Sequence, residues 1–360
     1  MRVTTVSSCK LRDSFRVQQI VGMFDLPTTD TLETQIDVEV PGLDEEWSIG
    51  LIIGPSGSGK STVARHAFGD AVYCGESWPD DRAMIDCLGE HPIKRITGTL
   101  TAVGFSSPPS WIKPYSVLST GQQFRSNLAR AFLRDQPLVV FDEFSSSVCR
   151  TVAKTSCIAI TKAIHRRRVD KRFVAVTCHD DIAEWLESDW VLNMASGELA
   201  RGRLQRRHIT LKVTGCAPEA WRLFRQHHYL SRTIHRSSQC YLASWNGDPV
   251  AFAAVIQAAG RYRVDRVTRV VVLPEYQGIG CGTGLLSAIG QHLRKRDRRL
   301  TCTTGHPGMI AALKHCAGWI ATRFYEAGTS RGDGKRRAVG RAVASFRYVG
   351  SKSIDSGRNQ

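Results

Sequence analysis

The sequence predicts an α/β protein with two domains, and three observations lead to this prediction. A chain of 360 residues with 42% hydrophobic residues is too long for one ordinary domain and can fill two cores. Two glycine-rich loops, near residues 54 and 278, each follow an apolar stretch and precede a stretch that can form a helix. The formal net charge changes from −4 over residues 1–200 (21 Lys and Arg, 25 Asp and Glu) to +20 over residues 201–360 (28 and 8), which indicates two units with different partners.

The first glycine-rich loop lies between a predicted buried strand, WSIGLII at 47–53, and a predicted helix, STVARHAF at 61–68. Residues 54–61, GPSGSGKS, fit the G-x-x-x-x-G-K-[ST] pattern of a phosphate-binding P-loop. Backbone N–H groups of such a loop surround phosphates, while its lysine reaches the outer phosphates and its last hydroxyl ligates Mg²⁺. The predicted ATP-binding residues are Gly54, Pro55, Ser56, Gly57, Ser58, Gly59, Lys60, Ser61 and Thr62.

A second element supports an ATPase. Residues 137–143, PLVVFDE, predict a buried strand that ends in two carboxylates, which is the Walker B pattern. An apolar run followed by two acidic residues is common in proteins, but the Walker B interpretation becomes more specific when this pattern follows a P-loop in the sequence. We expect Asp142 to hold Mg²⁺ together with Ser61, and Glu143 to polarise the attacking water as a catalytic residue.

Residues 117–133, VLSTGQQFRSNLARAFL, resemble the LSGGQ signature of ABC-type ATPases. The resemblance implies that this segment binds the γ-phosphate held by the P-loop of a second subunit, and hence that the chain forms an ATP-dependent homodimer. The strand FVAVTCHDD ends where this family keeps a switch histidine, so His179 is expected to sense the γ-phosphate. An aromatic residue is expected to stack on adenine, either Phe24 or, as an alternative, Phe15. The signature residues expected at the nucleotide are Ser119, Gly121 and Gln122.

Three departures from the ABC pattern bear on function. Lys60 and Ser119 are only about 60 residues apart, which leaves a small helical subdomain. No glutamine lies between them to form a Q-loop, and Cys149 stands where the D-loop aspartate is expected. No apolar run approaches the ~18 to 20 residues of a membrane span, so we expect no membrane partner and no transport. The eleven cysteines form no CxxC pair, which favours reduced thiols and a cytoplasmic location.

The second glycine-rich loop belongs to VDRVTRVVVLPEYQGIGCGTGLLSAIGQHL, residues 264–293. This stretch predicts a β-branched strand, a turn with proline, a Q-x-x-G-x-G loop at 277–282 and a helix. Backbone N–H groups at such a helix N-terminus can bind a pyrophosphate. A dinucleotide site is the alternative, but it would place G-x-G-x-x-G directly after the strand, whereas here the glycines follow VLPEYQ.

The pattern resembles the acetyl-CoA motif of GNAT-family N-acyltransferases. By this resemblance Val271, Val272 and Leu273 pair with the pantetheine arm of acetyl-CoA. The resemblance assigns the pyrophosphate to Gln277, Gly278, Ile279, Gly280, Cys281 and Gly282. The predicted fold class is therefore α/β: a P-loop NTPase domain of the ABC type followed by an α/β GNAT-fold domain with a mixed sheet. We expect the domains at 1–205 and 206–350, with a flexible tail at 351–360.

The catalytic residues of the second domain are harder to predict. GNAT enzymes often carry a tyrosine as general acid about four residues before a Gly-aromatic pair, and that position holds Lys314 here. We expect His228 and Tyr229 to take the catalytic role, because they lie where GNAT folds often build the acceptor site. His227 and His306 are alternatives, and orientation of the substrates alone can suffice.

The basic second half suits a phosphate backbone, and the acidic first half argues against a general bias of the chain toward arginine. The expected cofactors are ATP, Mg²⁺ and acetyl-CoA, and the expected function is ATP-dependent acylation with nucleic acid as acceptor or scaffold. Alternatives are acylation of a protein lysine or small amine, and a non-catalytic ABC-type ATPase of DNA metabolism with a GNAT-fold binding module. The basic residues that favour nucleic acid are Arg203, Arg206, Arg207, Arg261, Arg263, Arg266, Arg269 and the run RKRDRR at 294–299; the segment RRRVDKR at 166–172 is basic as well.

Overall fold

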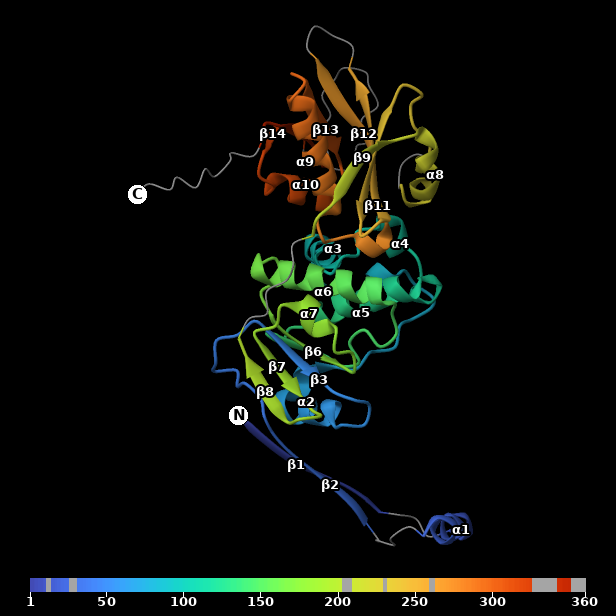
Figure 1. The fold of residues 1–360 in the computed structure, drawn as a ribbon, viewed down its shortest axis with the longest axis vertical. Helices are drawn as coiled ribbons and strands as arrows, with labels where there is room; N and C mark the ends of the chain where they lie inside the picture. The colour runs from blue at the N-terminus through green and yellow to red at the C-terminus, as the bar shows by residue number, and fades with distance from the viewer. Residues whose placement is uncertain are drawn as a thin grey trace, which may run out of the picture. The chain divides into compact units, whose positions relative to one another are not determined.

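The computed structural model describes residues 1–10, 14–25, 31–202, 209–228, 232–258, 263–325 and 342–350 (Figure 1). The chain forms two compact units, each assembled from separate stretches. The first unit comprises residues 1–75, 134–146 and 170–206, and the second comprises residues 76–133, 147–169 and 207–360. No helix in the described ranges is long and apolar enough to cross a membrane.

A six-stranded sheet forms the centre of the first unit, in the order β4-β5-β6-β3-β7-β8. Neighbouring strands are parallel except for β7 and β8. Every residue of β3 and β5 is buried, as expected of parallel strands covered on both faces. The carboxyl ends of β3, β5 and β6 lie at one edge of the sheet, where their following residues can meet. The strands are β3 (Ile49–Ile53), β4 (Val72–Tyr73), β5 (Leu138–Phe141), β6 (Arg172–Thr177), β7 (Trp190–Asn193) and β8 (Glu198–Arg201).

Helix α2 (Lys60–Phe68) covers this sheet and buries Val63, Ala64 and Phe68 in its core. Helix α7 (Ile182–Leu186) follows β6. A separate antiparallel hairpin pairs β1 (Arg2–Lys10) with β2 (Thr31–Glu39), and α1 (Phe15–Phe24) lies between these two strands in the chain.

Four helices form the first part of the second unit: α3 (Ile93–Ala102), α4 (Pro108–Trp111), α5 (Thr120–Leu133) and α6 (Arg150–His165). Helix α3 packs against both α5 and α6. Helix α6 buries eleven of its sixteen residues, more than one amphipathic face requires, so it is covered on more than one side.

A seven-stranded mixed sheet forms the rest of the second unit, in the order β14-β15-β13-β12-β11-β10-β9. Only β12 and β13 pair in parallel among the described strands of this sheet. Helices α9 (Cys281–Arg294) and α10 (Pro307–Lys314) pack into one core, and α8 (Trp221–Phe224) packs into another with Phe252 and Val271. The strands are β9 (Lys212–Cys216), β10 (Gln239–Trp245), β11 (Asp248–Gln257), β12 (Val264–Val272), β13 (Arg299–Thr304), β14 (Trp319–Tyr325) and β15 (Val343–Tyr348).

The predicted fold class is confirmed: a P-loop α/β unit is combined with an α/β unit that has a mixed sheet. The compact units nevertheless interleave along the chain. The helical stretches 76–133 and 147–169 lie within the predicted first domain but cluster with the second unit. The division at residues 205 and 206 stays a prediction, and the predicted tail at 351–360 lies outside the described residues.

Candidate functional site

The P-loop connects β3 to α2 in the first unit. Gly59 stands at the N-terminus of α2 with φ +82°, and a Cβ atom there would lie 2.1 Å from Ile36 Cδ1 of β2. The backbone conformation therefore favours glycine at this position, and an added Cβ atom would also have to displace the end of the Ile36 side chain. Lys60 Nζ donates hydrogen bonds to the carbonyl oxygens of Gly54 (2.9 Å) and Pro55 (2.8 Å), so its ammonium group lies within the loop. This arrangement of a cation and a helix N-terminus can bind phosphate.

The structure brings the Walker B carboxylate to the P-loop. Ser61 Oγ donates to Asp142 Oδ1 at 2.9 Å, although the two residues are 81 positions apart. The side chain of Asp142 is buried, and Glu143 follows it in a left-handed backbone conformation (φ +54°) with an exposed side chain. A hydroxyl and a carboxylate oxygen are ligands that Mg²⁺ prefers, usually beside waters and substrate phosphates. These two residues thus fit the predicted Mg²⁺ role.

A cavity of about 60 Å³ adjoins this pair and is lined by Ser56, Lys60, Asp142, Glu143, Thr177 and Cys178, among others. The predicted switch residue, His179, follows directly and donates its backbone N–H to Thr177 Oγ1 at 3.2 Å. Residues after β3, β5 and β6 therefore meet at one edge of the sheet. This edge of the sheet thus brings together Lys60, the Ser61–Asp142 pair and Thr177, and their roles toward ATP and Mg²⁺ stay predictions.

The predicted adenine contacts are not brought to this edge. Phe24 is 64% exposed and Phe15 is 74% exposed, and α1 has no buried residue. Helix α1 follows the end of the hairpin at which Lys10 pairs with Thr31 (Figure 1). Along β2, Thr31 is five residues from Ile36, the residue that lies against the P-loop, and this separation corresponds to about 16 Å at ~3.3 Å per residue. Contact of either aromatic side chain with adenine stays a prediction.

The signature segment lies in the second unit. Ser119 immediately precedes α5, its carbonyl accepts from Gln123 N (2.8 Å), and its side chain is exposed. Gln122 Oε1 accepts from Ser119 N at 3.1 Å, and Gly121 allows close packing, since a Cβ atom there would lie 3.2 Å from Val152 of α6. An exposed serine at the N-terminus of a fourteen-residue helix can contact a phosphate on another molecule.

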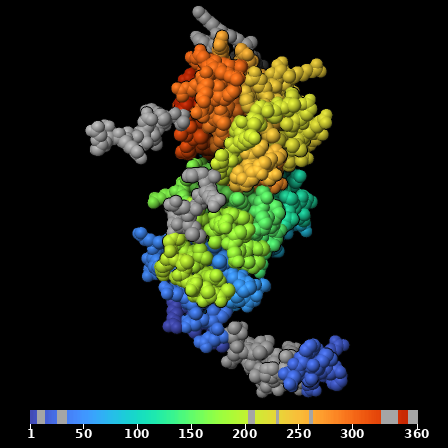
Figure 2. Space-filling view, in the orientation of Figure 1, coloured from blue at the N-terminus to red at the C-terminus, as the bar shows by residue number. Residues whose placement is uncertain are grey.

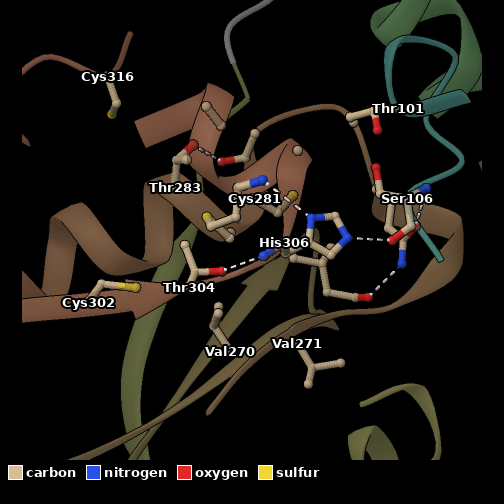
Figure 3. A pocket seen from close by; sticks show the side chains of 18 of the residues that line it. Thr101, Ser106, Val270, Val271, Cys281, Thr283, Cys302, Thr304, His306 and Cys316 are labelled. Atoms are coloured by element: carbon tan, nitrogen blue, oxygen red, sulfur yellow. Dashed lines mark hydrogen bonds between the residues drawn. The ribbon is translucent and has the colours of Figure 1, made fainter. Parts of the chain in front are cut away.

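A second and larger cavity, about 600 Å³, lies within the second unit (Figure 3). Its shape follows from the sheet, because the parallel pairing of β12 and β13 ends at Val267 and Cys302. Both strands continue beyond these residues, and the cavity opens between them. Val270, Val271 and Val272 line one side, and residues 302–304 line the other. The edge of β12 thus offers extended backbone to an elongated ligand.

The glycine-rich loop closes one end of this cavity. Gly278 and Gly280 both adopt positive φ, +83° and +104°, and Gly280 directly precedes α9. Gly282 allows α9 to approach β12, because a Cβ atom there would lie 3.2 Å from Val272 Cγ2. The predicted pyrophosphate residues that line the cavity are Gln277, Gly278, Gly280, Cys281 and Gly282.

Two predicted ligand residues are otherwise engaged. The side chain of Ile279 is buried in the core with α9, and it is not among the lining residues of the cavity. Leu273 donates its backbone N–H to Val250 O at 3.0 Å, so this N–H is used within the sheet. Backbone groups alternate along a strand, so those of Val271 face β11 as Leu273 does, whereas those of Val272 face away from β11; pairing of Val271 and Val272 with a pantetheine arm stays a prediction.

His227 and His228 line the same cavity, whereas Tyr229 lies outside the described residues. Burial lowers the pKa of His227, against the opposing charge of Glu275, so its imidazole is neutral near pH 7. The ring of His228 packs edge-on against Trp221, with centroids 5.8 Å apart. Both histidines thus border the cavity, and a catalytic role for either stays a prediction.

His306 has a structural role instead. Its Nδ1 accepts from Met309 N (3.3 Å) as the N-cap of α10, which leaves Nε2 as the donor to Ser106 O at 3.1 Å (Figure 3). Burial also lowers the pKa of His306. Because both ring nitrogens are engaged, His306 is not available as a base in this arrangement.

The predicted basic residues differ in their surroundings. Arg263 and Arg266 are exposed, whereas Arg269 donates from Nε to Thr233 O at 3.0 Å. Within the run at 294–299, Arg298 donates to Asp265 Oδ1 at 2.5 Å, and the Asp265 side chain is 1% exposed. Arg298 therefore neutralises a buried carboxylate and is not a free surface cation. Residues 203, 206, 207 and 261 lie outside the described ranges.

Sequence reasoning missed one wall of the cavity. Two of the residues that line this wall are Thr101, near the end of α3, and Ser106, which follows α3. The others are Lys162, in the last turn of α6, and Arg166 and Arg168, which follow α6. The basic segment at 166–172 was visible in the sequence. Nothing in its local pattern indicated that it would meet the glycine-rich loop more than 100 residues later.

Comparison with known proteins matches residues 204–319 to the acetyltransferase (GNAT) family. Among solved structures, a dimeric bacterial ABC transporter cassette is 16% identical with a TM-score of 0.38, covering 49% of this chain and 93% of its own. The ribosomal-protein-S18-alanine N-acetyltransferase from Escherichia coli is 15% identical with a TM-score of 0.31, covering 42% and 100%. The IAA acetyltransferase from Bacillus cereus is 14% identical with a TM-score of 0.29, covering 39% and 99%. A comparison with curated protein sequences found no match. The stretch that matches the acetyltransferase (GNAT) family model, residues 204–319, thus contains the strand and the glycine-rich loop of the larger cavity.

Proposed function

We propose that this chain binds and hydrolyses ATP as an ABC-type ATPase and transfers an acyl group from acetyl-CoA to an amine, with nucleic acid as the acceptor or scaffold. The cavity between β12 and β13 carries the second part of this proposal. It combines an extended strand edge with a glycine-rich helix N-terminus. The former suits a pantetheine arm and the latter suits a pyrophosphate.

In the transfer step, the acceptor nitrogen attacks the thioester carbonyl of acetyl-CoA. The new C–N bond forms, the C–S bond breaks, and CoA leaves as a thiolate that takes up a proton. His227, neutral near pH 7, accepts the proton that the amine loses, and His228 is the second candidate for this role. Backbone N–H groups at the free edge of β12 stabilise the oxyanion that forms on the carbonyl oxygen.

In the ATPase step, Lys60 and the P-loop N–H groups bind the phosphates of ATP, and Ser61 and Asp142 hold Mg²⁺. Mg²⁺, when bound, neutralises charge that develops on the phosphates. Glu143 orients the attacking water, and His179 contacts the γ-phosphate. The exposed Ser119 at the start of α5 completes the site of a second copy, which gives an ATP-dependent homodimer.

Nucleic acid is favoured as the acceptor or scaffold by exposed cations in the second unit, among them Arg263, Arg266, Arg296 and Arg299. Its exocyclic base amines are already neutral, so the transfer requires positioning more than deprotonation. A lysine acceptor starts at a pKa of about 10.4 and requires a base as well. Acylation of a protein lysine or small amine is therefore the second candidate function.

The proposal is tested by incubating the chain with labelled acetyl-CoA, ATP, Mg²⁺ and a mixture of nucleic acid and protein. We expect the label in the nucleic acid fraction. Label found on protein alone would refute the nucleic acid acceptor, and absence of acetyl-CoA binding would refute acyl transfer. A Lys60→Ala variant with an unchanged ATPase rate would refute the assignment of the first unit.

A further inference from the structure

The acyl-CoA cavity is the cavity of about 600 Å³ between β12 and β13. Helix α6 supplies one wall of it, although α6 lies in the helical stretches 76–133 and 147–169, which also contain the ABC-type signature segment. Lys162 lies in the last turn of α6, and Arg166 and Arg168 follow in the turn after it. All three line the 600 Å³ cavity together with the glycine-rich loop. The cavity and these cations lie within the second compact unit.

The helical segments are joined to the acyl-CoA motif by buried polar contacts. Arg125 of α5 donates to the carbonyl oxygens of Pro274 (Nη1, 2.6 Å) and Glu275 (Nη2, 3.0 Å), just before the glycine-rich loop. The same Nη2 donates to Thr155 Oγ1 of α6 at 3.1 Å, and Arg125 is only 2% exposed. One guanidinium group thus connects the signature helix, α6 and the loop at residues 274–275.

Backbone and core contacts strengthen this connection. Gln277 Oε1 accepts from Ser106 N at 2.9 Å, and a Cβ atom at Gly278 would lie 2.7 Å from Gly104 Cα. Ile158 of α6 belongs to the same hydrophobic core as α9. In Figure 2 light orange atoms of the second unit lie directly against green atoms, in agreement with these contacts. The position of α6 beside the loop is therefore fixed by packing.

The cations lie where negative charge of the acyl donor is expected. Lys162 Nζ is 3.1 Å from the position that a Cβ atom at Gly280 would take, so the ammonium group lies against the loop at the N-terminus of α9. Arg166 and Arg168 form no ion pair with a described residue. Burial lowers the pKa of Arg168, and the like charge of Arg166 lowers it further. A bound anion would offset both effects, because it stabilises the charged guanidinium group.

We propose that Lys162, Arg166 and Arg168 bind the phosphate groups of the acyl donor, so that the acyl-CoA site is complete only with α6. The proposal rests on the acyltransferase function proposed above and adds that these three cations select an acyl donor that carries phosphate groups. A pyrophosphate and a 3′-phosphate, the latter with about −1.5 to −2 charges, match three cations and a helix N-terminus. Donors without these phosphates are excluded from tight binding.

The test measures binding of acetyl-CoA and of S-acetylpantetheine, which lacks the phosphates, by isothermal titration calorimetry. We expect Lys162→Met and Arg168→Met each to weaken acetyl-CoA binding about 10-fold or more, which corresponds to ~1.4 kcal/mol per variant. Both variants should bind S-acetylpantetheine as the unsubstituted chain does. Arg167→Met is the matched control, because Arg167 is exposed between Arg166 and Arg168 and does not line the cavity.

The outcomes separate the two proposals. If the unsubstituted chain binds no acetyl-CoA, the acyltransferase function is wrong and this inference falls with it. If the unsubstituted chain binds acetyl-CoA and both variants bind it equally well, the function stands and the role of α6 is refuted. Should one variant fail to fold, as its melting temperature would reveal, the other variant and the salt dependence of binding decide the result.

Discussion

Replacement of Arg125 by methionine is the most direct perturbation of the contact between α5, the helix of the signature segment, and residues 274–275 before the glycine-rich loop. Methionine keeps the length and apolar stem of the side chain but removes the donors to Pro274 O, Glu275 O and Thr155 Oγ1. Thr155 would lose its donor in a buried environment, and the carbonyl oxygens of Pro274 and Glu275 would lose theirs in a partly buried one. The loop before the pyrophosphate-binding residues would then be held less firmly.

The magnitude follows from two opposing contributions. Three hydrogen bonds from a charged donor are worth about 1.5–3 kcal/mol each, or roughly 4.5–9 kcal/mol together. Burial lowers the pKa of Arg125 to about 10, which corresponds to roughly 3 kcal/mol against the charged form. The net loss on substitution is therefore about 1.5–6 kcal/mol in the free energy of unfolding of the second unit.

The assay is guanidinium-induced unfolding of Arg125→Met, followed by tryptophan fluorescence, together with acetyl-CoA titration of the folded variant. Arg130→Met is the matched control on the same helix, since Arg130 pairs with the exposed Glu76 and stacks on Trp78. Such a pair contributes about 0–1 kcal/mol and the cation–π contact about 0.5–1 kcal/mol. If Arg125→Met is no more destabilised than Arg130→Met and binds acetyl-CoA unchanged, the reasoning about the buried guanidinium is wrong.

Three further predictions concern the two sites. Asp142→Asn should lower the rate of Mg²⁺-dependent ATP hydrolysis at least ~100-fold, because it removes the charged partner of Ser61. A phosphate-release assay at saturating Mg²⁺ measures this rate, and a rate near that of the unsubstituted chain would contradict the prediction. Gly59→Ala should weaken ATP binding at least ~10-fold, since the positive φ at this position strains any residue that has a Cβ atom. Equal affinity in a fluorescent-nucleotide titration would count against the P-loop geometry. The lowered pKa of His227 keeps its neutral base form present down to below pH 6.5, so kcat/KM for acetyl transfer should fall only on the acidic side of that value. If the fall in kcat/KM at acidic pH persists in His227→Gln, His227 is not the base.

The phosphate-binding elements could be predicted from sequence because their chemistry is local. The P-loop and the Q-x-x-G-x-G loop each require glycines with positive φ at fixed offsets before a helix, and the structure has them at Gly59 and Gly280. The meeting of Ser61 with Asp142 could also be anticipated, because parallel strands bring their carboxyl ends to one edge.

The missed features depend on packing between distant segments. Arg125 looks like a polar surface position of an amphipathic helix, yet it is buried because residues 274–275 supply its acceptors 150 positions away. Lys162 lies in a helix whose sequence does not indicate what covers it. His306 illustrates the converse, since a histidine that could be catalytic is used as a helix cap. Shape complementarity between segments decides each case, and local patterns do not encode it.

The expected ATP-dependent acylation requires that ATP binding and acyl transfer are coupled in this chain. It is tested most directly by measuring transfer of labelled acetyl groups from acetyl-CoA to nucleic acid, with and without ATP and Mg²⁺, for the unsubstituted chain and Lys60→Ala. Lys94→Ala, which changes an exposed lysine of α3, is the control. The account predicts transfer that requires ATP in the unsubstituted chain and the control and is lost in Lys60→Ala. Transfer at the same rate without ATP, or in Lys60→Ala, would contradict it.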